Sequence, residues 1–203
     1  MTTRLNAQDI SNMDRVERLK IINSISGIKS VNLIGTKSKN GITNLSIISS
    51  VTHIGSDPPL LSFISRPNKI VKRDTINNIT EQPYFTINSV EKSKLRNAHL
   101  TSGKYPENIS EFQECDFKEL YIEKFPIPFV ESSRIKIGLK VVEKINIKSN
   151  DTIMIIGLIQ ILQIPKNYLT KEKNQNIGVV GLNTYYSLNK ENEFEYIRIK
   201  SKK

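Results

Sequence analysis

The chain has few of the residue types that build disulfides and histidine-rich metal sites. Its 203 residues include no tryptophan and a single cysteine, Cys115, which excludes an intrachain disulfide and a cysteine-based metal site. His53 and His99 are the two histidines, so a site built from several imidazoles is excluded as well. We therefore expect no metal site of these kinds.

Long apolar runs are also missing. The longest, Ile153–Ile164, is interrupted by Gly157, Gln160 and Gln163 and is too short to cross a bilayer as a helix. The segment Met1–Lys20 lacks the apolar stretch of a secretory signal peptide, so we expect a cytoplasmic protein without a membrane partner. A G-x-G-x-x-G sequence is absent too, and with it the dinucleotide fingerprint of the Rossmann type.

The charge balance is basic, with 30 Lys and Arg against 20 Asp and Glu and a formal net charge of +10. Such an excess favours an anionic partner, but a general enrichment in lysine, isoleucine and asparagine explains it better. Single-stranded nucleic acid is bound by basic grooves with stacking aromatic side chains. Because only 7% of the residues are aromatic and no basic stripe stands out, we do not expect nucleic acid as a partner.

The length fits one domain with a full core, and a composition of 37% hydrophobic and 25% charged residues is that of a globular protein. Hydrophobic periodicity predicts more strands than helices. We expect helices at Asp14–Ile25, Arg73–Glu81 and Ser93–His99, and strands at Val31–Thr36, Ile42–Ser49, Leu60–Ser65, Tyr84–Val90, Arg134–Lys148, Ile153–Ile164 and Ile177–Leu182. Gly27 is expected to end the first helix, Asn40-Gly41 to form a hairpin turn, Asp57-Pro58-Pro59 to break the chain, and Thr101–Pro128 to be rich in loops. Many strands with few short helices favour an antiparallel barrel over an alternating parallel sheet.

Two long strand candidates have different patterns. Within Arg134–Lys148, isoleucine, leucine and valine alternate with lysines, apart from Glu143, which predicts a half-buried antiparallel strand with its lysines in solvent. The run Ile153–Ile164 is apolar on both faces, so we expect the barrel core to cover one face and a helix or a second subunit to cover the other.

The most specific stretch is Asn44–Pro67, NLSIISSVTHIGSDPPLLSFISRP. It places hydroxyl groups around a strand end, where they and the backbone amides can hold a phosphate and a polyol chain. Arg66 closes the stretch and offers a charge-assisted phosphate contact. Arg73, Asp74 and Thr75 then begin a predicted helix, whose free amides and dipole favour an anion. Ordinary strand-end capping and solvated arginines remain the alternative interpretation.

This stretch resembles the flavin reductase-like, FMN-binding split-barrel family, and the resemblance extends over nearly the whole chain. Five segments are similar to that family in the right order: Gly27–Thr36 to its first barrel strand, Asn44–Pro67 to its flavin-binding strand, turn and strand, Arg73–Val90 to its helix and the strand ending in asparagine, Asn97–Phe112 to the loop that closes over the flavin, and Gly181–Leu188 to the C-terminal segment of one subgroup. The resemblance implies a mainly β, Greek-key antiparallel split barrel with a few short helices. We expect one domain over 1–203, with a helical lead-in at 1–29, the barrel at 30–182 and a C-terminal tail at 183–203.

The resemblance also implies a set of cofactor-binding residues. On the ribityl and isoalloxazine side these are Ser46, Ser49, Ser50, Val51 and Thr52; around the phosphate they are Arg66, Arg73, Asp74 and Thr75; at the pocket edge is Asn88; and from the closing loop, of this chain or of a partner subunit, come His99, Ser102, Lys104 and Tyr105. The subgroup often has a histidine where this chain has Ser89, a departure that bears on activity if that histidine touches flavin or substrate.

By the same resemblance, FMN is the expected cofactor and NAD(P)H the expected electron donor, in a homodimer with flavin sites at the interface. Such a reductase passes hydride from nicotinamide to flavin and can supply reduced flavin to a partner oxygenase. It needs little acid–base machinery, because the cofactors supply the chemistry. His99 is the candidate proton donor, since histidine titrates near neutral pH, although hydrogen bonding to the phosphate or the loop is the favoured interpretation. A flavin-dependent oxidoreductase on another small-molecule substrate and a non-catalytic FMN-binding protein are the alternatives.

Overall fold

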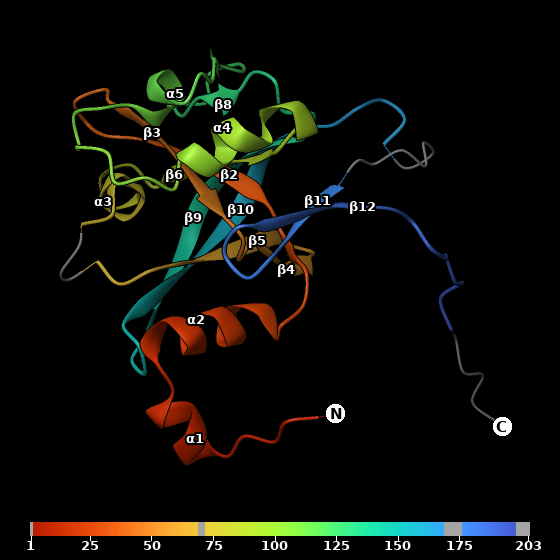
Figure 1. Ribbon diagram of the computed structural model, residues 1–203. Coiled ribbons are helices and arrows are strands. Elements are labelled where there is room, and N and C mark those ends of the chain that lie inside the picture. The colour runs from red at the N-terminus through yellow and green to blue at the C-terminus, as the bar shows by residue number, and fades with distance from the viewer. Residues whose placement is uncertain (1, 69–71, 169–175, 198–203) are drawn as a thin grey trace, which may run out of the picture.

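The computed structural model describes residues 2–68, 72–168 and 176–197, and its largest element is a seven-stranded antiparallel sheet (Figure 1). The sheet has the order β3-β2-β6-β9-β10-β5-β4 and consists of β2 (Asn32–Lys37), β3 (Thr43–Ile48), β4 (Thr52–Ser56), β5 (Pro59–Ser65), β6 (Tyr84–Ser89), β9 (Lys136–Ile147) and β10 (Thr152–Gln163). A three-stranded sheet of order β1-β11-β12 contains β1 (Lys29–Ser30), β11 (Asn176–Val180) and β12 (Thr184–Leu188). A short pair joins β7 (Glu119–Leu120) to β8 (Phe129–Val130). The mainly β, antiparallel fold expected from the sequence is confirmed.

The helices are short and lie outside the sheets. They are α1 (Ala7–Asn12), α2 (Arg15–Ser24), α3 (Asp74–Glu81), the 3-10 turn η1 (Lys92–Lys94), α4 (Leu95–Leu100) and α5 (Glu111–Glu114). Asp14 caps α2 by accepting from the backbone N–H groups of Val16 and Glu17, and Gly27, at φ +80°, follows its end as expected. Within the described ranges, no helix is long and apolar enough to cross a membrane.

The two edge strands of the large sheet, β3 and β4, follow one another in the chain, and Ser50 lies between them. Its hydroxyl donates to the Ile64 carbonyl at 3.1 Å and accepts from the Ile64 N–H at 3.0 Å. A side chain thus makes the two bonds that a neighbouring strand would make at this position of β5. The loop between β3 and β4 is thereby hydrogen-bonded to β5, which lies near the sheet edge opposite to β3.

Aromatic rings fill the centre of the sheet. Phe63 of β5 and Phe85 of β6 are fully buried and meet edge to face, with ring centroids 5.3 Å apart. Gly157 of β10 lies against the second ring, because a Cβ built there would come within 2.7 Å of it. Burying each phenylalanine stabilises the fold by about 1.5–3 kcal/mol. This packing makes the sheet a rigid support for the loops at its ends.

The hairpin turns partly follow the sequence prediction. Gly41 has φ +87° between β2 and β3, as a turn residue there requires. The Asp57-Pro58-Pro59 sequence does not separate two unrelated segments. It turns the chain tightly between β4 and β5, with Pro59 as the first residue of β5, where a missing N–H is tolerated. Strand β4 was not predicted, because Thr52–Ser56 contains Gly55 and lacks apolar alternation.

The prediction that the lysines of β9 share a solvent face is wrong at Lys136. This side chain is only 3% exposed, and its ammonium donates to the Ser133 carbonyl. The register between β9 and β10 also shifts next to Val142, since Ile156 pairs with Glu143 while Gly157 pairs with Val141. A bulge of this kind reverses the side-chain alternation beyond it, which explains why Ile145 is exposed although it shares the sequence parity of the buried residues.

Two apolar surfaces stay uncovered in the single chain. On β10, Ile155 and Ile156 are buried, whereas Leu162 and the following Ile164 are exposed. Helix α2, predicted as amphipathic, buries none of its residues. Coverage of these surfaces by a second subunit stays a prediction. The residues expected as a C-terminal tail include β12, which pairs with β11.

Candidate functional site

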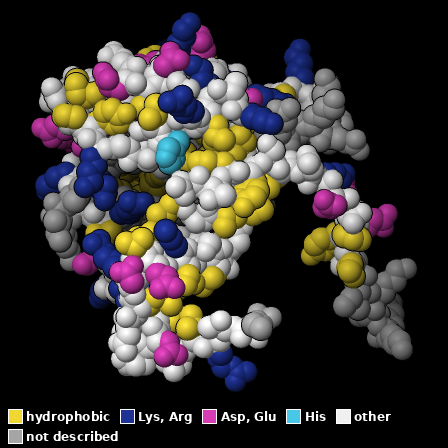
Figure 2. All heavy atoms as spheres, viewed as in Figure 1, with side chains coloured by type: hydrophobic (Ala, Val, Ile, Leu, Met, Phe, Trp, Pro, Cys, Tyr) yellow, Lys and Arg dark blue, Asp and Glu magenta, His cyan; other side chains and the backbone are white. Residues whose placement is uncertain are grey.

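One cavity, here called the His99 cavity, lies where the barrel, α4 and the three-stranded sheet meet. It has a volume of about 340 Å³ and is lined by Val31, Ile47, Ser49, Arg66, His99, Ser102, Val179, Gly181, Leu182, Asn183 and Tyr185. Figure 2 shows the hollowed face of the molecule, with hydrophobic side chains inside the hollow and Lys and Arg side chains beside it. Segments that lie far apart in the chain therefore form one site.

The cavity has an apolar floor and a polar rim. Val31 and Val179 are buried, and Ile47 packs partly buried against the same core cluster. Arg66 and His99 are exposed at the rim. A flat apolar ring fits such a floor, and a guanidinium beside it suits a phosphate or carboxylate.

Helix α4 is attached to the barrel by Thr101. Its hydroxyl accepts from the Ile47 N–H at 2.9 Å and donates to the Ala98 carbonyl at 2.8 Å, and Ala98 is fully buried. Because Ile47 is a floor residue, this contact fixes the end of α4 relative to the cavity floor. His99, which lies between Ala98 and Thr101, is held at the rim by the same contact.

His99 also contacts the three-stranded sheet. Its Nδ1 lies 2.8 Å from the hydroxyl oxygen of Tyr185, and the two rings meet edge to face with centroids 5.7 Å apart. Burial raises the pKa of the Tyr185 phenol, so the hydroxyl keeps its proton at neutral pH. The rim thus carries one imidazole oriented by a neutral hydroxyl.

The structure brings four of the sequence-predicted residues together, because Ser49, Arg66, His99 and Ser102 all line this cavity. The other residues of the first group have different surroundings: Ser46 lies on β3, Ser50 is bonded to Ile64, Val51 packs on the core, and Thr52 begins β4. Lys104 is exposed, and Tyr105 hydrogen-bonds the Cys115 sulfur at 3.5 Å. None of these last six residues lines the His99 cavity.

The residues at α3 that were predicted to bind phosphate lie in different environments. Arg73 precedes the helix, and its Nε is buried without a hydrogen-bond partner in the described part of the chain. Thr75 is buried, and its hydroxyl accepts from the Asn44 amide at 3.2 Å. Asp74 lines a different cavity. Buried polar atoms are rarely left unpaired, so the Arg73 Nε indicates a missing acceptor.

Asn88 lies in the core. The side chain is fully buried, its amide donates to the Leu33 carbonyl and the Thr86 hydroxyl, and its oxygen accepts from the Val130 N–H. Asn88 therefore joins β6 to β2 and β8 and lines neither cavity.

Sequence reasoning did not assign the residues that complete the His99 cavity to a binding site. Val31 and Val179 come together because β1 pairs with β11, Lys29 opposite Val179, across 150 residues of chain. Tyr185 follows because it pairs with Val179 in the β11–β12 hairpin. The available signal was the resemblance of Gly181–Leu188 to a family segment, which indicated its importance but gave no location in the fold.

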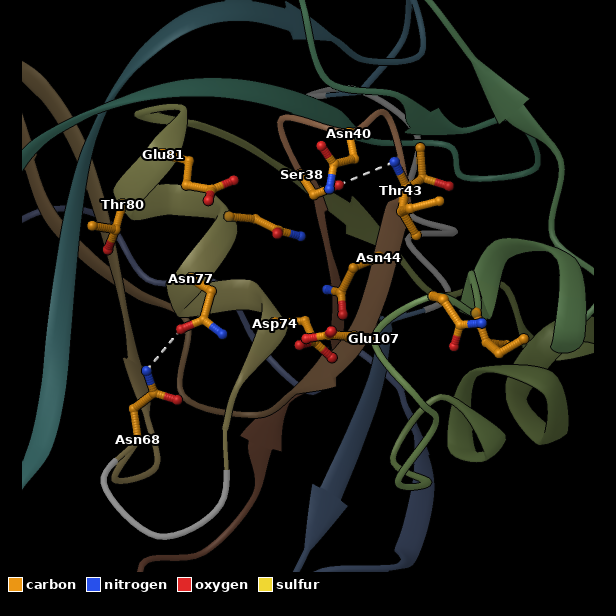
Figure 3. A pocket seen from close by; sticks show the side chains of 14 residues that line it. Ser38, Asn40, Thr43, Asn44, Asn68, Asp74, Asn77, Thr80, Glu81 and Glu107 are labelled. Carbon is orange, nitrogen blue, oxygen red and sulfur yellow. Dashed lines mark hydrogen bonds between the residues drawn. The ribbon is translucent and has the colours of Figure 1, made fainter.

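A second cavity, here called the Asp74 cavity, lies at the opposite end of β3, beside the β2–β3 turn (Figure 3). It has a volume of about 590 Å³ and is lined by Ser38, Asn40, Ile42, Thr43, Asn44, Asn68, Asp74, Asn77, Asn78, Thr80, Glu81, Glu107, Asn108 and Ile109. Asp74 and Glu107 lie side by side in this view, and the Asn68 amide donates to Asn77 at 3.0 Å. Burial and, to a smaller extent, the Glu107 charge raise the pKa of Asp74. No Lys or Arg stands among these lining residues, so the cavity is poorly suited to a phosphate.

Comparison with known proteins gives a consistent family assignment. The family described as flavin reductase like domain matches residues 28–177. A candidate flavin reductase with a split barrel domain from Shewanella frigidimarina NCIMB 400 has a similar crystal structure, at 35% identity and a TM-score of 0.91, covering 97% of this chain and 100% of that one.

Two further structures share the fold at lower identity. Nitrilotriacetate monooxygenase component B from Bacillus cereus is 18% identical with a TM-score of 0.84, covering 96% of this chain and 99% of its own. The 2-nitrobenzoate 2-nitroreductase of Pseudomonas fluorescens is 19% identical with a TM-score of 0.81, covering 96% of each chain. The match over residues 28–177 and the 35% identity over nearly the whole chain show that this protein belongs to the flavin reductase-like family of split-barrel flavoproteins.

Proposed function

We propose that the His99 cavity binds FMN and that the protein is an NAD(P)H-dependent flavin reductase. The observation that carries the proposal is the convergence of Ser49, Arg66, His99 and Ser102 on one cavity with an apolar floor. These residues come from two segments, Asn44–Pro67 and Asn97–Phe112, whose resemblance to the family was drawn from sequence alone. In space they combine the hydroxyls, the cation and the apolar surface that a flavin phosphate and ring require.

The residues fit a flavin phosphate in one further respect. The Arg73 Nε is a buried donor that has no acceptor in the described part of the chain. A phosphate oxygen is an acceptor of the kind that a guanidinium prefers. Arg66, at the end of β5, offers the second guanidinium. FMN has this phosphate, and riboflavin does not, so the guanidinium of Arg66 at the cavity rim favours FMN.

In this proposal, the protein's own groups bind and orient the flavin. Val31, Ile47 and Val179 exclude water from one side of the site, and the rim hydroxyls of Ser49 and Ser102 offer hydrogen bonds to the polyol chain. His99 holds a proton at the rim. When bound, the flavin supplies the hydride-accepting ring, which is why no catalytic triad or carboxylate pair is needed.

The same proposal includes a homodimer and a cytoplasmic location, where nicotinamide cofactors are available. Val16, Ile25 and Ile28 are more than half exposed in the single chain, and a second copy related by a two-fold axis would cover them. Similarity to a monooxygenase component supports delivery of reduced flavin to a partner oxygenase. Similarity to a nitroreductase keeps a flavin-dependent reaction on another substrate as the second candidate.

The test is the visible absorption spectrum of the purified protein, titrated with FMN and then, without oxygen, with NADH or NADPH. We expect the flavin bands to shift on binding and to bleach with one of the two donors. A shift without bleaching by either donor would leave an FMN-binding protein whose reductant is not a nicotinamide. No shift at all would overturn the assignment of the cavity.

A further inference from the structure

The C-terminal hairpin provides a contact to the rim that lies outside the family match. The match covers residues 28–177, whereas Tyr185 belongs to β12, beyond its end. The Tyr185 hydroxyl lies 2.8 Å from His99 Nδ1, and both residues line the His99 cavity.

We propose that Tyr185 is a positioning residue that fixes His99 in the tautomer with its proton on Nε2, so that this proton faces bound flavin and its reductant. The proposal rests on the proposed function, because it assigns the neutral His99 as a hydrogen-bond donor, through Nε2–H, to flavin bound in this cavity. Tyr185 acts through His99 and touches no reacting atom.

The direction of the hydrogen bond follows from the partners of each group. In the described part of the chain, the Tyr185 hydroxyl has no acceptor other than His99 Nδ1. In the proposal, the neutral phenol donates to this acceptor, which leaves Nδ1 unprotonated and places the imidazole proton on Nε2. Nε2 itself has no hydrogen-bond partner among the described residues, so it remains available to a ligand.

Tyr185 and His99 are each held in place by the secondary-structure element to which they belong. Tyr185 pairs with Val179 in the β11–β12 ladder and packs partly buried against the core cluster that contains Val31 and Phe112. His99 follows the fully buried Ala98 at the end of α4. The hydrogen bond therefore joins two supported elements, and the imidazole has little freedom to rotate.

The first experiment reads the tautomer directly, by the ring-nitrogen NMR shifts of the flavin-free protein at a pH where histidine is neutral. His53 is the only other histidine and serves as an internal reference, because it is exposed on β4. We expect one Nε2–H tautomer at His99 in the wild type and a mixture of both tautomers in Tyr185→Phe. Tyr186→Phe, which alters the adjacent and exposed tyrosine, is the matched control and should match the wild type.

The second experiment measures nicotinamide-dependent flavin reduction in a double-mutant cycle. We expect Tyr185→Phe to lower kcat about tenfold with KM for the donor unchanged, and to have no effect in a His99→Gln background. An Nδ1–H tautomer in the wild type, unchanged His99 shifts in Tyr185→Phe, or an equal loss of kcat in both backgrounds would overturn the proposal. Absence of nicotinamide oxidation by the wild type would instead overturn the proposed function, because the tautomer is read without flavin.

Discussion

The two cavities lie at opposite ends of β3 and differ in nearly every property. The Asp74 cavity is the larger, is lined by polar groups with three carboxylates, and is built entirely from residues 38–109. The His99 cavity is smaller, has an apolar floor and an arginine at its rim, and combines residues from 31 to 185. Volume alone would select the Asp74 cavity, whereas the proposed flavin site is the smaller His99 cavity. The better criterion is where chemically matched residues from distant parts of the chain converge.

The largest expected effect comes from filling each cavity in turn. Ser49→Trp places an indole in the His99 cavity and should weaken FMN binding by at least about 100-fold, which corresponds to about 2.7 kcal/mol. Thr80→Trp adds the same ring to the Asp74 cavity and should leave binding within about twofold of the wild type. Titration of each variant by flavin absorbance gives both values. The opposite pattern would transfer the flavin site to the Asp74 cavity.

The next effect separates a support residue from a ligand-binding one. Asn88→Ala removes three buried hydrogen bonds and should lower the free energy of unfolding by about 2–4 kcal/mol. FMN affinity of the folded variant should be unchanged. Denaturant unfolding and flavin titration measure the two quantities, and Asn146→Ala on the exposed part of β9 is the control. Weaker flavin binding at unchanged stability would instead support the sequence-based prediction that Asn88 lies at the edge of the flavin pocket.

A smaller loss is expected at the rim cation of the His99 cavity. Arg66→Ala should weaken FMN binding roughly 10–100-fold, since a charge-assisted hydrogen bond contributes about 1.5–3 kcal/mol. Riboflavin, which lacks the phosphate, should bind the variant and the wild type equally. Arg96→Ala, an exposed arginine of α4 away from the cavity, is the matched control. Equal losses for FMN and riboflavin would show that Arg66 does not bind the phosphate.

The smallest effect concerns the Asp74 cavity and depends on pH. The pKa of Asp74 is raised in the folded state, so this state holds the Asp74 proton more tightly than the unfolded state does. Stability is therefore lost as the pH rises from the ordinary value of 3.8 through the raised folded pKa. Glu107→Gln removes part of that loss and should stabilise the protein at pH 7 by no more than about 1 kcal/mol.

The measurement for Glu107→Gln is denaturant unfolding at a series of pH values, with Glu81→Gln from the same cavity as the control. The stability gain should shrink as the pH falls toward the ordinary carboxyl range. A gain that is independent of pH would mean that Glu107 acts on stability by some route other than the Asp74 charge.

The sequence predicted those parts of the fold that depend on local patterns. Alternating or continuous apolar runs located β2, β3, β5, β6, β9, β10 and β11, and Asp14 and Gly27 marked the ends of α2. It failed where tertiary context overrides the pattern. The alternation in β9 did not reveal the bulge next to Val142 or the burial of Lys136, because both depend on register with β10 and on the loop at Ser133.

For the site, the sequence could name residues within a continuous motif but could not say which of them meet. Ser49 and Arg66 come from one motif and His99 from another, and all three line one cavity. Val179 and Tyr185 remained undetected because their positions follow from pairing between β1, β11 and β12, at sequence separations that no short pattern encodes. Asp74 and Arg73 are neighbours in sequence, yet only Asp74 lines the larger cavity.

The most direct test of the account is the electron density of crystals soaked with FMN. We predict the isoalloxazine ring over Val31 and Ile47 in the His99 cavity, within reach of His99, with the phosphate contacting Arg66 or the Arg73 Nε. Flavin density in the Asp74 cavity, with the His99 cavity free of it, would contradict the account.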